Sequence, residues 1–475
     1  MGGGCGVKNW WGMLAVMLGL EGGLALVAAE PLEKPRYSPA QRLTRVRLAG
    51  TQASVEKLAS VRRQLPAIPG LTDYRCSFHA HAEDASHTGG TRPEMLAGAL
   101  AAGVQAVFLS DHFRPPRDFM DSWRFKTNGV LFIPGSECRG FLAHPDASVM
   151  PHMEAPIPDW VKRVGSGSGM VFLSHIEERM DHPMDGLTGL EIYNRHYDAK
   201  RDLTGMLSLV SRLTDPRQLE ELRALVREYP DGVLASQVGY QEVYLDKWDR
   251  ETAERRLTGV GANDCHHNQV FVLHKVDEST ARLGTVVDPL ESMRLVPVAL
   301  RPGILKILEG RAAGERVELV DFDPYERAFR CVSTHVLAER LEEGAMREAV
   351  KAGRVYVAHT WMGDATGFRM GWLDAGEAEL STRVRCWMGD EREFEGGGRI
   401  DVESPLPGRL RLIRGGVEVA RSEGNRLSVP VNEAGVYRAE VWLELDGEWR
   451  LWIYSNPVYL RAGLRNASDA GTGSE

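Results

Sequence analysis

The segment Arg75-Cys-Ser-Phe-His-Ala-His81 decides how the first part of this chain is interpreted. His79 and His81 stand one residue apart in it, and side chains at alternate positions of an extended strand point to the same face. The two imidazoles are therefore predicted to form a clamp for one metal ion. A second polar group, Ser110-Asp-His112, follows another apolar run further along the chain.

A strand-helix-strand unit is predicted between these two groups. Thr91-Arg-Pro-Glu94 has the pattern of a capping box, apolar residues recur at helical spacing over 95–100, and Gly103 is typical of a helix end. Residues 104–109 then form an apolar run typical of a buried parallel strand. Both histidine groups should therefore lie at the same end of neighbouring strands, where barrel enzymes place their catalytic residues.

The same alternation continues beyond this unit and predicts a parallel α/β domain. Apolar runs end in polar residues at 130–134 before Glu137, 170–174 before His175, 187–193 before Asn194 and 259–262 before Asp264. Helices are predicted at 215–229, opened by Asp215-Pro216, and at 336–352, ended by Gly353. The second of these helices is expected to close the domain.

The chain changes character near residue 366, where alternating strands and glycine turns begin. Strands are predicted at 409–414 and 417–420 around Gly415-Gly416, and at 439–445 and 448–454 around Asp446-Gly447. Gly435-Val-Tyr437 resembles the tyrosine corner of sandwich domains. Residues 366–462 are therefore predicted to form a small β-sandwich.

Three tryptophans, Trp442, Trp449 and Trp452, leave two interpretations of this sandwich open. If exposed, they would support binding to a polymer or to the cell surface. If buried, they would belong to a core that buttresses the first domain. Aromatic residues at alternating strand positions are more often core residues, so the second interpretation is favoured.

Composition narrows the class of protein. A chain of 475 residues is too long for one ordinary core and predicts two folded domains. The net charge of −9 is not that of a protein with a basic nucleic-acid surface, so no nucleic-acid partner is expected. Six cysteines without a CxxC pair predict no disulfide framework. Cys76, Cys138 and Cys265 adjoin the polar groups and are interpreted as packing residues.

Residues 1–29 have the pattern of a signal peptide. Lys8 precedes two apolar runs, and Val27-Ala-Ala29 offers small residues for cleavage. Glu21 interrupts the apolar character, which leaves later starts at Met13 or Met17 open, as well as a frayed apolar helix. We expect a periplasmic or secreted protein with no stable membrane span after signal removal.

Two further segments flank the predicted domains. Residues 30–70 are expected to form a helical extension that packs on the first domain, and residues 463–475 a disordered tail.

The polar groups, taken together, resemble the PHP (polymerase and histidinol phosphatase) family of metallohydrolases. The matching motifs are His79-x-His81, His87, Ser110-Asp-His112, Pro134-Gly-Ser-Glu137, Leu173-Ser-His175 and Asn263-Asp-Cys-His266. The resemblance implies a distorted (β/α)7 barrel over residues 71–360, followed by the β-sandwich. Lys351-Ala-Gly-Arg-Val-Tyr356 and Ser455-Asn-Pro-Val-Tyr459 are similar to the carbaryl hydrolase (CehA/McbA) branch, which is associated with ester and carbamate substrates.

The resemblance also implies a ligand set for two or three divalent transition-metal ions, namely zinc, manganese or iron. The implied metal ligands are His79, His81, His87, His112, Glu137, His144, His175, Asp264 and His266. Glu137 would bridge two ions, and Asp264 would lie opposite the first histidine pair. Whether Asp84 or His87 is the ligand stays open, and Asp111 is expected to orient its neighbour rather than to bind metal.

The implied chemistry is hydrolysis by a hydroxide shared between metal ions, with Glu137, Asp264 and His266 as the catalytic residues. Arg114, Arg139 and Asn194 are candidate substrate contacts, and so is His196. We expect an exported hydrolase of a small ester, either a phosphoester or a carboxyl or carbamate ester. The alternative is an inactive metal-binding accessory protein whose sandwich binds a polymer or surface. The sequence does not indicate an oligomeric state.

Overall fold

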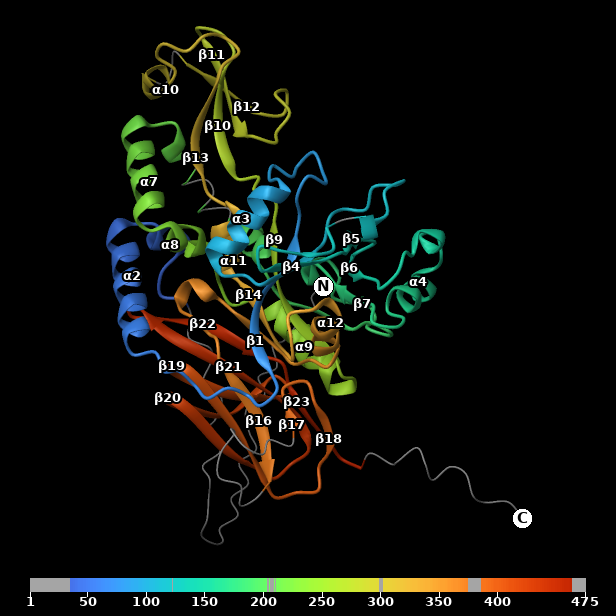
Figure 1. Ribbon diagram of the computed structural model, residues 1–475. Coiled ribbons are helices and arrows are strands. Elements are labelled where there is room, and N and C mark those ends of the chain that lie inside the picture. Colours follow the sequence, from blue (N-terminus) through green and yellow to red (C-terminus); the bar gives the residue numbers. More distant parts are fainter. Residues whose placement is uncertain are drawn as a thin grey trace, which may run out of the picture.

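The computed structural model describes residues 35–463 apart from 122, 203–204, 206–208, 210, 299–301 and 375–385. Figure 1 shows a sheet-and-helix region at the centre, a small sheet that projects from it, and a strand-rich C-terminal region on the opposite side. The predicted signal peptide lies outside the described residues, as does the predicted tail from residue 464 onward. Within the described part of the chain, no helix combines the length and the apolar character that crossing a membrane requires.

The central region is built on a mixed sheet. Its strands pair in the order β4 (Val130–Ile133), β2 (Ala106–Leu109), β1 (Thr72–Ala80), β9 (Thr258–Cys265), β8 (Gly189–Asn194), β7 (Met170–Leu173), β6 (Phe141–His144) and β5 (Ser136–Cys138). The run from β4 to β7 is parallel, whereas β6 and β5 are antiparallel, and the short β3 (Lys126–Thr127) pairs with β4. An isolated parallel bridge pairs His112, which follows the end of β2, with Glu137 of β5. The α/β class is confirmed, but the expected seven-unit barrel is not.

Helices connect and cover these strands. They are α3 (Arg92–Ala102), α4 (Ile157–Val164), α5 (Arg195–Arg201), α7 (Pro216–Glu228), α8 (Pro230–Leu234), α9 (Glu242–Glu254), α11 (Tyr325–Cys331) and α12 (Glu343–Lys351). Short 3-10 turns occur at η1 (Phe119–Asp121), η2 (Met150–His152), η3 (Ile176–Glu178), η4 (Ala235–Gln237) and η5 (Thr360–Met362). The predicted caps of α3 are confirmed, because Thr91 and Glu94 form a capping box and Gly103 has φ +67°. Asp215 likewise caps α7.

The predicted helix at 336–352 is wrong in its first half. Residues Ser333–Ala338 form strand β14, and only Glu343–Lys351 is helical, as α12. The apolar Val336 packs in one core cluster with Cys76 and Phe78 of β1, with which β14 pairs antiparallel. This tertiary pairing overrides the local helical tendency. Gly353, at φ +69°, follows the helix end as expected.

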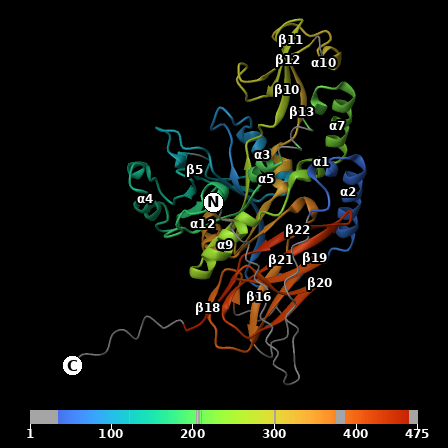
Figure 2. The ribbon, with the colours of Figure 1, turned by 180° about the vertical axis from the view of Figure 1, so that it is seen from behind.

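A second, four-stranded antiparallel sheet follows β9 and was not predicted. Its order is β12 (Arg294–Pro297), β11 (Thr280–Thr285), β10 (Val270–Lys275) and β13 (Arg316–Asp321), with α10 (Pro302–Ile307) beside it. Its core is shared with α7, where Leu219 and Leu222 pack in one cluster with Phe271 and Leu319. In Figures 1 and 2 it projects away from the C-terminal strands.

The C-terminal region is rich in strands, as predicted. They are β16 (Arg369–Asp374), β17 (Cys386–Trp387), β18 (Glu391–Glu393), β19 (Gly398–Arg414), β20 (Val417–Val431), β21 (Gly435–Leu445), β22 (Glu448–Ser455) and β23 (Val458–Arg461). Both predicted hairpins are present, since β19 pairs with β20 from Arg414 and Val417 and β21 pairs with β22 from Leu445 and Glu448. The Tyr437 hydroxyl donates to the Glu433 carbonyl at 2.8 Å, which is the hydrogen bond of a tyrosine corner.

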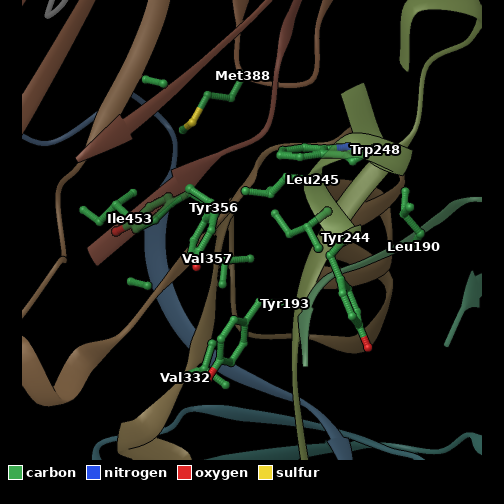
Figure 3. Close-up of a cluster of buried hydrophobic side chains, with 14 of the residues drawn as sticks. Leu190, Tyr193, Tyr244, Leu245, Trp248, Val332, Tyr356, Val357, Met388 and Ile453 are labelled. Atoms are coloured by element: carbon green, nitrogen blue, oxygen red, sulfur yellow. The ribbon is translucent and has the colours of Figure 1, made fainter. Parts of the chain in front are cut away.

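The C-terminal strands share one hydrophobic core with the central region. Strand β15 (Val355–Ala358) pairs with β14 on one side and with β22 on the other. Figure 3 shows Tyr193 of β8 and Tyr356 of β15 in the same cluster as Met388 and Ile453. Trp442 and Trp452 are buried in this cluster, at 6% and 0% exposure, and Trp449 is half-buried against it. Their burial supports the buttress interpretation over a surface for polymer binding.

The N-terminal extension is helical, with α1 (Pro39–Arg42) and α2 (Arg45–Ser60). It lies against α8 and also against β21 of the C-terminal region. Arg42 forms a buried ion pair with Glu448, with Nη2 and Oε1 2.7 Å apart. The expectation that the extension packs on the first domain is therefore right only in part.

Asn456 joins the C-terminal region to the central sheet and gives a direct test of this packing. Its Nδ2 donates to the Gly259 and Val355 carbonyls at 2.9 and 3.0 Å, and its Oδ1 accepts from the Gly259 amide at 2.8 Å. We predict that Asn456→Ala lowers the thermal midpoint by several degrees, because three buried hydrogen bonds worth about 1 kcal/mol each are lost. Asn425→Ala, which removes a half-buried bond to the Ser404 carbonyl, is the control. Equal effects of the two changes in a thermal melt would contradict this linkage.

Candidate metal centre

Seven of the nine predicted ligands converge at the carboxyl ends of the central strands. His79 and His81 come from the end of β1, His112 follows β2, Glu137 is in β5, His175 follows β7, and Asp264 and His266 come from the end of β9. The arrangement agrees with the expectation from sequence that polar residues at parallel strand ends meet at one edge.

Glu137 lies at the centre of this cluster. Its Oε2 is 3.5 Å from His79 Nε2, 3.8 Å from His81 Nε2 and 3.4 Å from His112 Nε2. Its other oxygen, Oε1, is 3.1 Å from His175 Nε2. The two carboxylate oxygens thus face different histidines, which is the arrangement that a ligand shared between two ions needs.

Asp264 faces three of the same histidines from β9, the strand next to β1. Its Oδ1 is 3.3 Å from His79 Nε2 and 3.6 Å from His81 Nε2, and its Oδ2 is 3.7 Å from His175 Nε2. Three groups of side chains have ligand atoms close enough to hold an ion: His79 with His81 and Asp264, His79 with Glu137 and His175, and His81 with His112 and His266. The cluster therefore fits a site for more than one metal ion.

A surrounding set of acceptors fixes how the histidines present their nitrogens. Glu191 Oε1 accepts from His79 Nδ1 at 2.6 Å, and Asp84 Oδ2 accepts from both His81 Nδ1 at 2.9 Å and His112 Nδ1 at 2.7 Å. Because a carboxylate only accepts, the proton must be on Nδ1 in each case. Nε2 is therefore the atom of each ring that is available to a metal ion, and among the described residues buried His79 Nε2 has no hydrogen-bond partner.

The backbone of the site adopts conformations that are unfavourable for residues other than glycine. His79, His175 and Asp264 have φ of 59°, 47° and 49°. The pairing of β1 with both neighbours shifts register between Phe78 and Ala80. The two histidines of the opening motif thus approach each other, at 5.1 Å between ring centroids, through an irregular strand end and not through the regular alternation predicted.

In the metal-free protein, protons on histidines balance the negative charge of the carboxylates in the site. Burial disfavours the imidazolium of His79, but Asp264, Glu137 and Glu191 outweigh it and raise its pKa well above the ordinary value. Burial is likewise outweighed at His175, where Glu137 and Glu177 raise the pKa to about 10. Burial and the neighbouring His266 instead lower the pKa of His81 to about 3. His81 is therefore neutral at physiological pH and ready to bind metal through Nε2.

The structure assigns different positions to Asp84 and His87, which the sequence left as alternatives. Asp84 is buried and uses one oxygen to hold two histidines, so it orients ligands. His87 lies beside the cluster, with its ring centroid 4.8 Å from that of His112 and 5.0 Å from that of His266. Asp111 was expected to orient His112, but it forms an ion pair with Arg92 and accepts from the Ala82 amide.

His144 is not brought into the cluster. Its side chain is fully buried, with ring contacts to Phe78, Phe108 and Phe172, and its Nδ1 donates to the Pro134 carbonyl at 3.3 Å. None of the three ligand groups contains it. The ligand role that the family resemblance implies for His144 is therefore not supported by its position.

Three of the four candidate substrate contacts are also placed elsewhere, and only His196 lines the cavity described below. Asn194 is fully buried, where its amide donates to Glu191 and its oxygen caps α5. Arg139 lies over the Trp160 ring and donates to the Met153 carbonyl. Arg114 is exposed and does not line the cavity described below.

A cavity of about 250 Å³ opens over the cluster. Its walls include Glu137, His175, Asp264 and His266, together with His196 and Arg195 of α5. The sequence analysis missed Glu191 and Arg195. A signal for Glu191 exists in the sequence, because it is a charged residue inside an apolar run, and a buried carboxylate requires a partner.

Comparisons with known proteins add little. No family model matches the chain, and no curated protein is found as a relative. One solved structure that matches is a two-domain protein from Bacteroides vulgatus ATCC 8482 containing a predicted PHP-like metal-dependent phosphoesterase. It is 14% identical, the match covers 83% of this chain and 98% of that chain, and the TM-score is 0.30. A likeness this low does not establish a shared fold, so the capability of the site has to be inferred from its own residues.

The raised pKa of His175 predicts how metal binding depends on pH. Because folding raises this pKa from the ordinary 6.5 to about 10, the protonated form stabilises the metal-free protein fully below pH 6.5, and this contribution is lost as the pH rises towards 10. Metal must displace this proton and the one that His79 holds, so the apparent affinity should rise at least about tenfold per pH unit within that window. Competition with a coloured chelator at several pH values measures it. An affinity independent of pH would contradict the assignment of His175 as a ligand.

The role of Asp84, which orients two ligands without binding metal itself, can be tested separately from the ligands. Asp84→Asn leaves every ligand in place but weakens the hydrogen bonds that orient His81 and His112, so metal affinity should fall about 10–100-fold. Asp73→Asn is the matched control, because Asp73 holds the buried His335 Nδ1 at 2.8 Å, near the other end of β1. The control should lower stability but leave metal affinity unchanged. If both variants bind metal like the wild type, Asp84 does not position the ligands.

Proposed function

We propose that this protein is a metal-dependent hydrolase of the PHP family that cleaves a small ester. One observation carries the proposal. His79, His81 and His112 each donate Nδ1 to a carboxylate and turn Nε2 towards Glu137. A structural histidine has no need of both features, whereas a metal ligand with an orienting partner has them.

The residues that would hold the ions follow from the distances. His79, His81 and Asp264 would hold one ion, and Glu137 would share its two oxygens between this ion and one at His175, while His112 and His266 serve a further position. Imidazole with carboxylate suits zinc, manganese or iron. Bound divalent ions would lower the pKa of a shared water and polarise the ester oxygen.

The chain itself supplies orientation and enclosure. Glu191 and Asp84 keep the Nε2 atoms directed inward, and the buried strand ends exclude water from all sides except the cavity. His196 on α5 lines that cavity with its Nδ1 3.7 Å from Asp264 Oδ2. Burial, followed by the charges of His175 and Lys200, lowers the pKa of His196, so from there its neutral ring can hydrogen-bond to a substrate in the cavity.

The motifs similar to the carbaryl hydrolase branch could in principle indicate the type of ester. These motifs lie at β15 and at β22–β23, where Tyr356, Asn456 and Tyr459 form buried hydrogen bonds. These residues join the C-terminal region to the central sheet and lie away from the cavity. They bear on architecture and not on substrate, so phosphoester and carboxyl or carbamate ester both stay within the proposal.

Export to the periplasm or the medium is also a proposal, and it rests on the pattern of residues 1–29 alone. The five cysteines that the structure describes are buried and free, so they form no disulfide with one another.

The test supplies manganese, zinc or iron to the purified protein and measures hydrolysis of p-nitrophenyl phosphate, a phosphodiester and aryl acetates. Elemental analysis should find two or three ions per chain. Glu137→Gln keeps the size of the side chain but removes the shared ligand, so metal content should fall and turnover should fall at least about 1,000-fold. Glu178→Gln, in the same cavity wall but paired with Lys200, should stay within about twofold.

An accessory protein without activity is the second candidate. It would bind metal, and its metal content would fall in Glu137→Gln. It would nevertheless hydrolyse none of these esters with any of the three metals. Hydrolysis by the metal-free protein would contradict the proposal outright.

A further inference from the structure

Arg195 is a buried cation in the wall of the metal-site cavity. It opens α5 directly after β8, the strand whose Glu191 holds His79. Its side chain is 6% exposed, and it borders the same cavity as Glu137, His175 and Asp264. Burial of a guanidinium is unfavourable unless its donors find acceptors.

The donors of Arg195 are not satisfied by the protein. Its Nε and Nη1 are buried and have no hydrogen-bond partner among the described residues. The carboxylate of Asp323 comes within 3.9 Å of Nη2, which is too far for a hydrogen bond. Asp323 is held at this distance by the backbone, because it accepts from the amides of Gln269 at 2.7 Å and Asn268 at 3.2 Å.

Other deeply buried arginines of this chain are treated differently. Arg347 donates to the His144 and Pro145 carbonyls and to Glu343. Arg369 pairs with Glu403 and donates to the Pro66 carbonyl. In both of these cases the fold supplies acceptors to the buried guanidinium, and Arg195 differs from them where a cavity adjoins it.

Three other cations lie near the cavity. Burial, His112 and Arg114 lower the pKa of His87 in the cavity wall, so Arg114 is close by, but it is exposed and does not line the cavity. Lys200, on the same helix, is 43% exposed and forms ion pairs with Glu177 and Glu178. Arg139 is placed against Trp160, as described above. Arg195 is therefore the cation best suited to meet a ligand inside this cavity.

We propose that Arg195 binds an anionic oxygen of the substrate, so that the ester cleaved at this site carries a negative charge. The inference rests on the proposed hydrolase function and deepens it. A phosphate or a carboxylate group accepts two parallel N–H bonds from a guanidinium, whereas a neutral acetate or carbamate offers one carbonyl oxygen. Phosphate and carboxylate both present such an oxyanion, so recognition by Arg195 favours charged esters over neutral ones.

The test compares metal-loaded wild type with Arg195→Met and Arg195→Lys. Arg201→Met is the matched control, because Arg201 is an exposed arginine on the same helix that donates to the Tyr240 carbonyl. Substrates are p-nitrophenyl phosphate, the mono-p-nitrophenyl ester of succinate, which carries a remote carboxylate, and neutral p-nitrophenyl acetate. Equilibrium dialysis with labelled inorganic phosphate gives a readout that does not need turnover, and elemental analysis checks that the metal content is unchanged.

We expect Arg195→Met to weaken phosphate binding at least about tenfold and to lower kcat/KM at least about 100-fold for the charged esters. The acetate should change by less than about threefold, and Arg195→Lys should recover part of the loss. Whichever charged ester the wild type prefers identifies phosphate or carboxylate as the source of the oxyanion. If Arg195→Met does not fold, which a thermal melt shows, the same comparison is made with Arg195→Lys.

Two results separate this inference from the function on which it rests. If charged and neutral esters lose activity equally, or if phosphate binding is the same in Arg195→Met as in wild type, Arg195 is a structural brace and the inference is wrong. If no ester is hydrolysed but phosphate binding depends on Arg195, the hydrolase proposal fails while the oxyanion site stands.

Discussion

The carboxylate of Glu137, shared among histidines from three other strand ends, is the interaction on which the site depends. Several carboxylates are buried within one small volume here, and they would repel each other without positive charge between them. Raised pKa values at His79 and His175 show how the metal-free protein supplies that charge with protons. Metal ions in this cluster would replace these protons.

The rest of the molecule can be understood as support for this cluster. Glu191 and Asp84 hold the imidazoles, and three site residues sit in left-handed backbone conformations that the surrounding strands must stabilise. The C-terminal region contributes at a distance. Asn456 of this region accepts a hydrogen bond from the Gly259 amide in β9, the strand whose end carries Asp264. This link gives the region a role in positioning the site, which agrees with the burial of Trp442 and Trp452.

Sequence reasoning found what is local and periodic. The capping box at Thr91, the hairpins around Gly415 and Asp446, and most strand ends were predictable because each depends on neighbouring residues. Strand β14 was mistaken for helix because only its pairing with β1, far away in sequence, identifies it. The projecting β10–β13 sheet was also missed, although β10 and β11 are neighbours in sequence and form a local hairpin.

The site also has features that could be predicted from the sequence and features that could not. Ligand types and their order could be predicted, since histidines and carboxylates at strand ends are visible in the sequence. The places of Asp84, His144 and Arg195 could not, because they depend on which side chain fills the space between two strands. Asp84 accepts from two histidines at once, and His144 turns towards phenylalanines. No spacing rule distinguishes these residues from true ligands.

The most direct test of the central claim is the location of metal in crystals of the manganese- or zinc-loaded protein, from anomalous scattering. We expect at least two peaks, one at each carboxylate oxygen of Glu137 and about 3.5–4 Å apart. Histidine Nε2 atoms should lie about 2.0–2.2 Å from the peaks. A single peak remote from Glu137, or coordination through Nδ1 of His79 or His81, would contradict it.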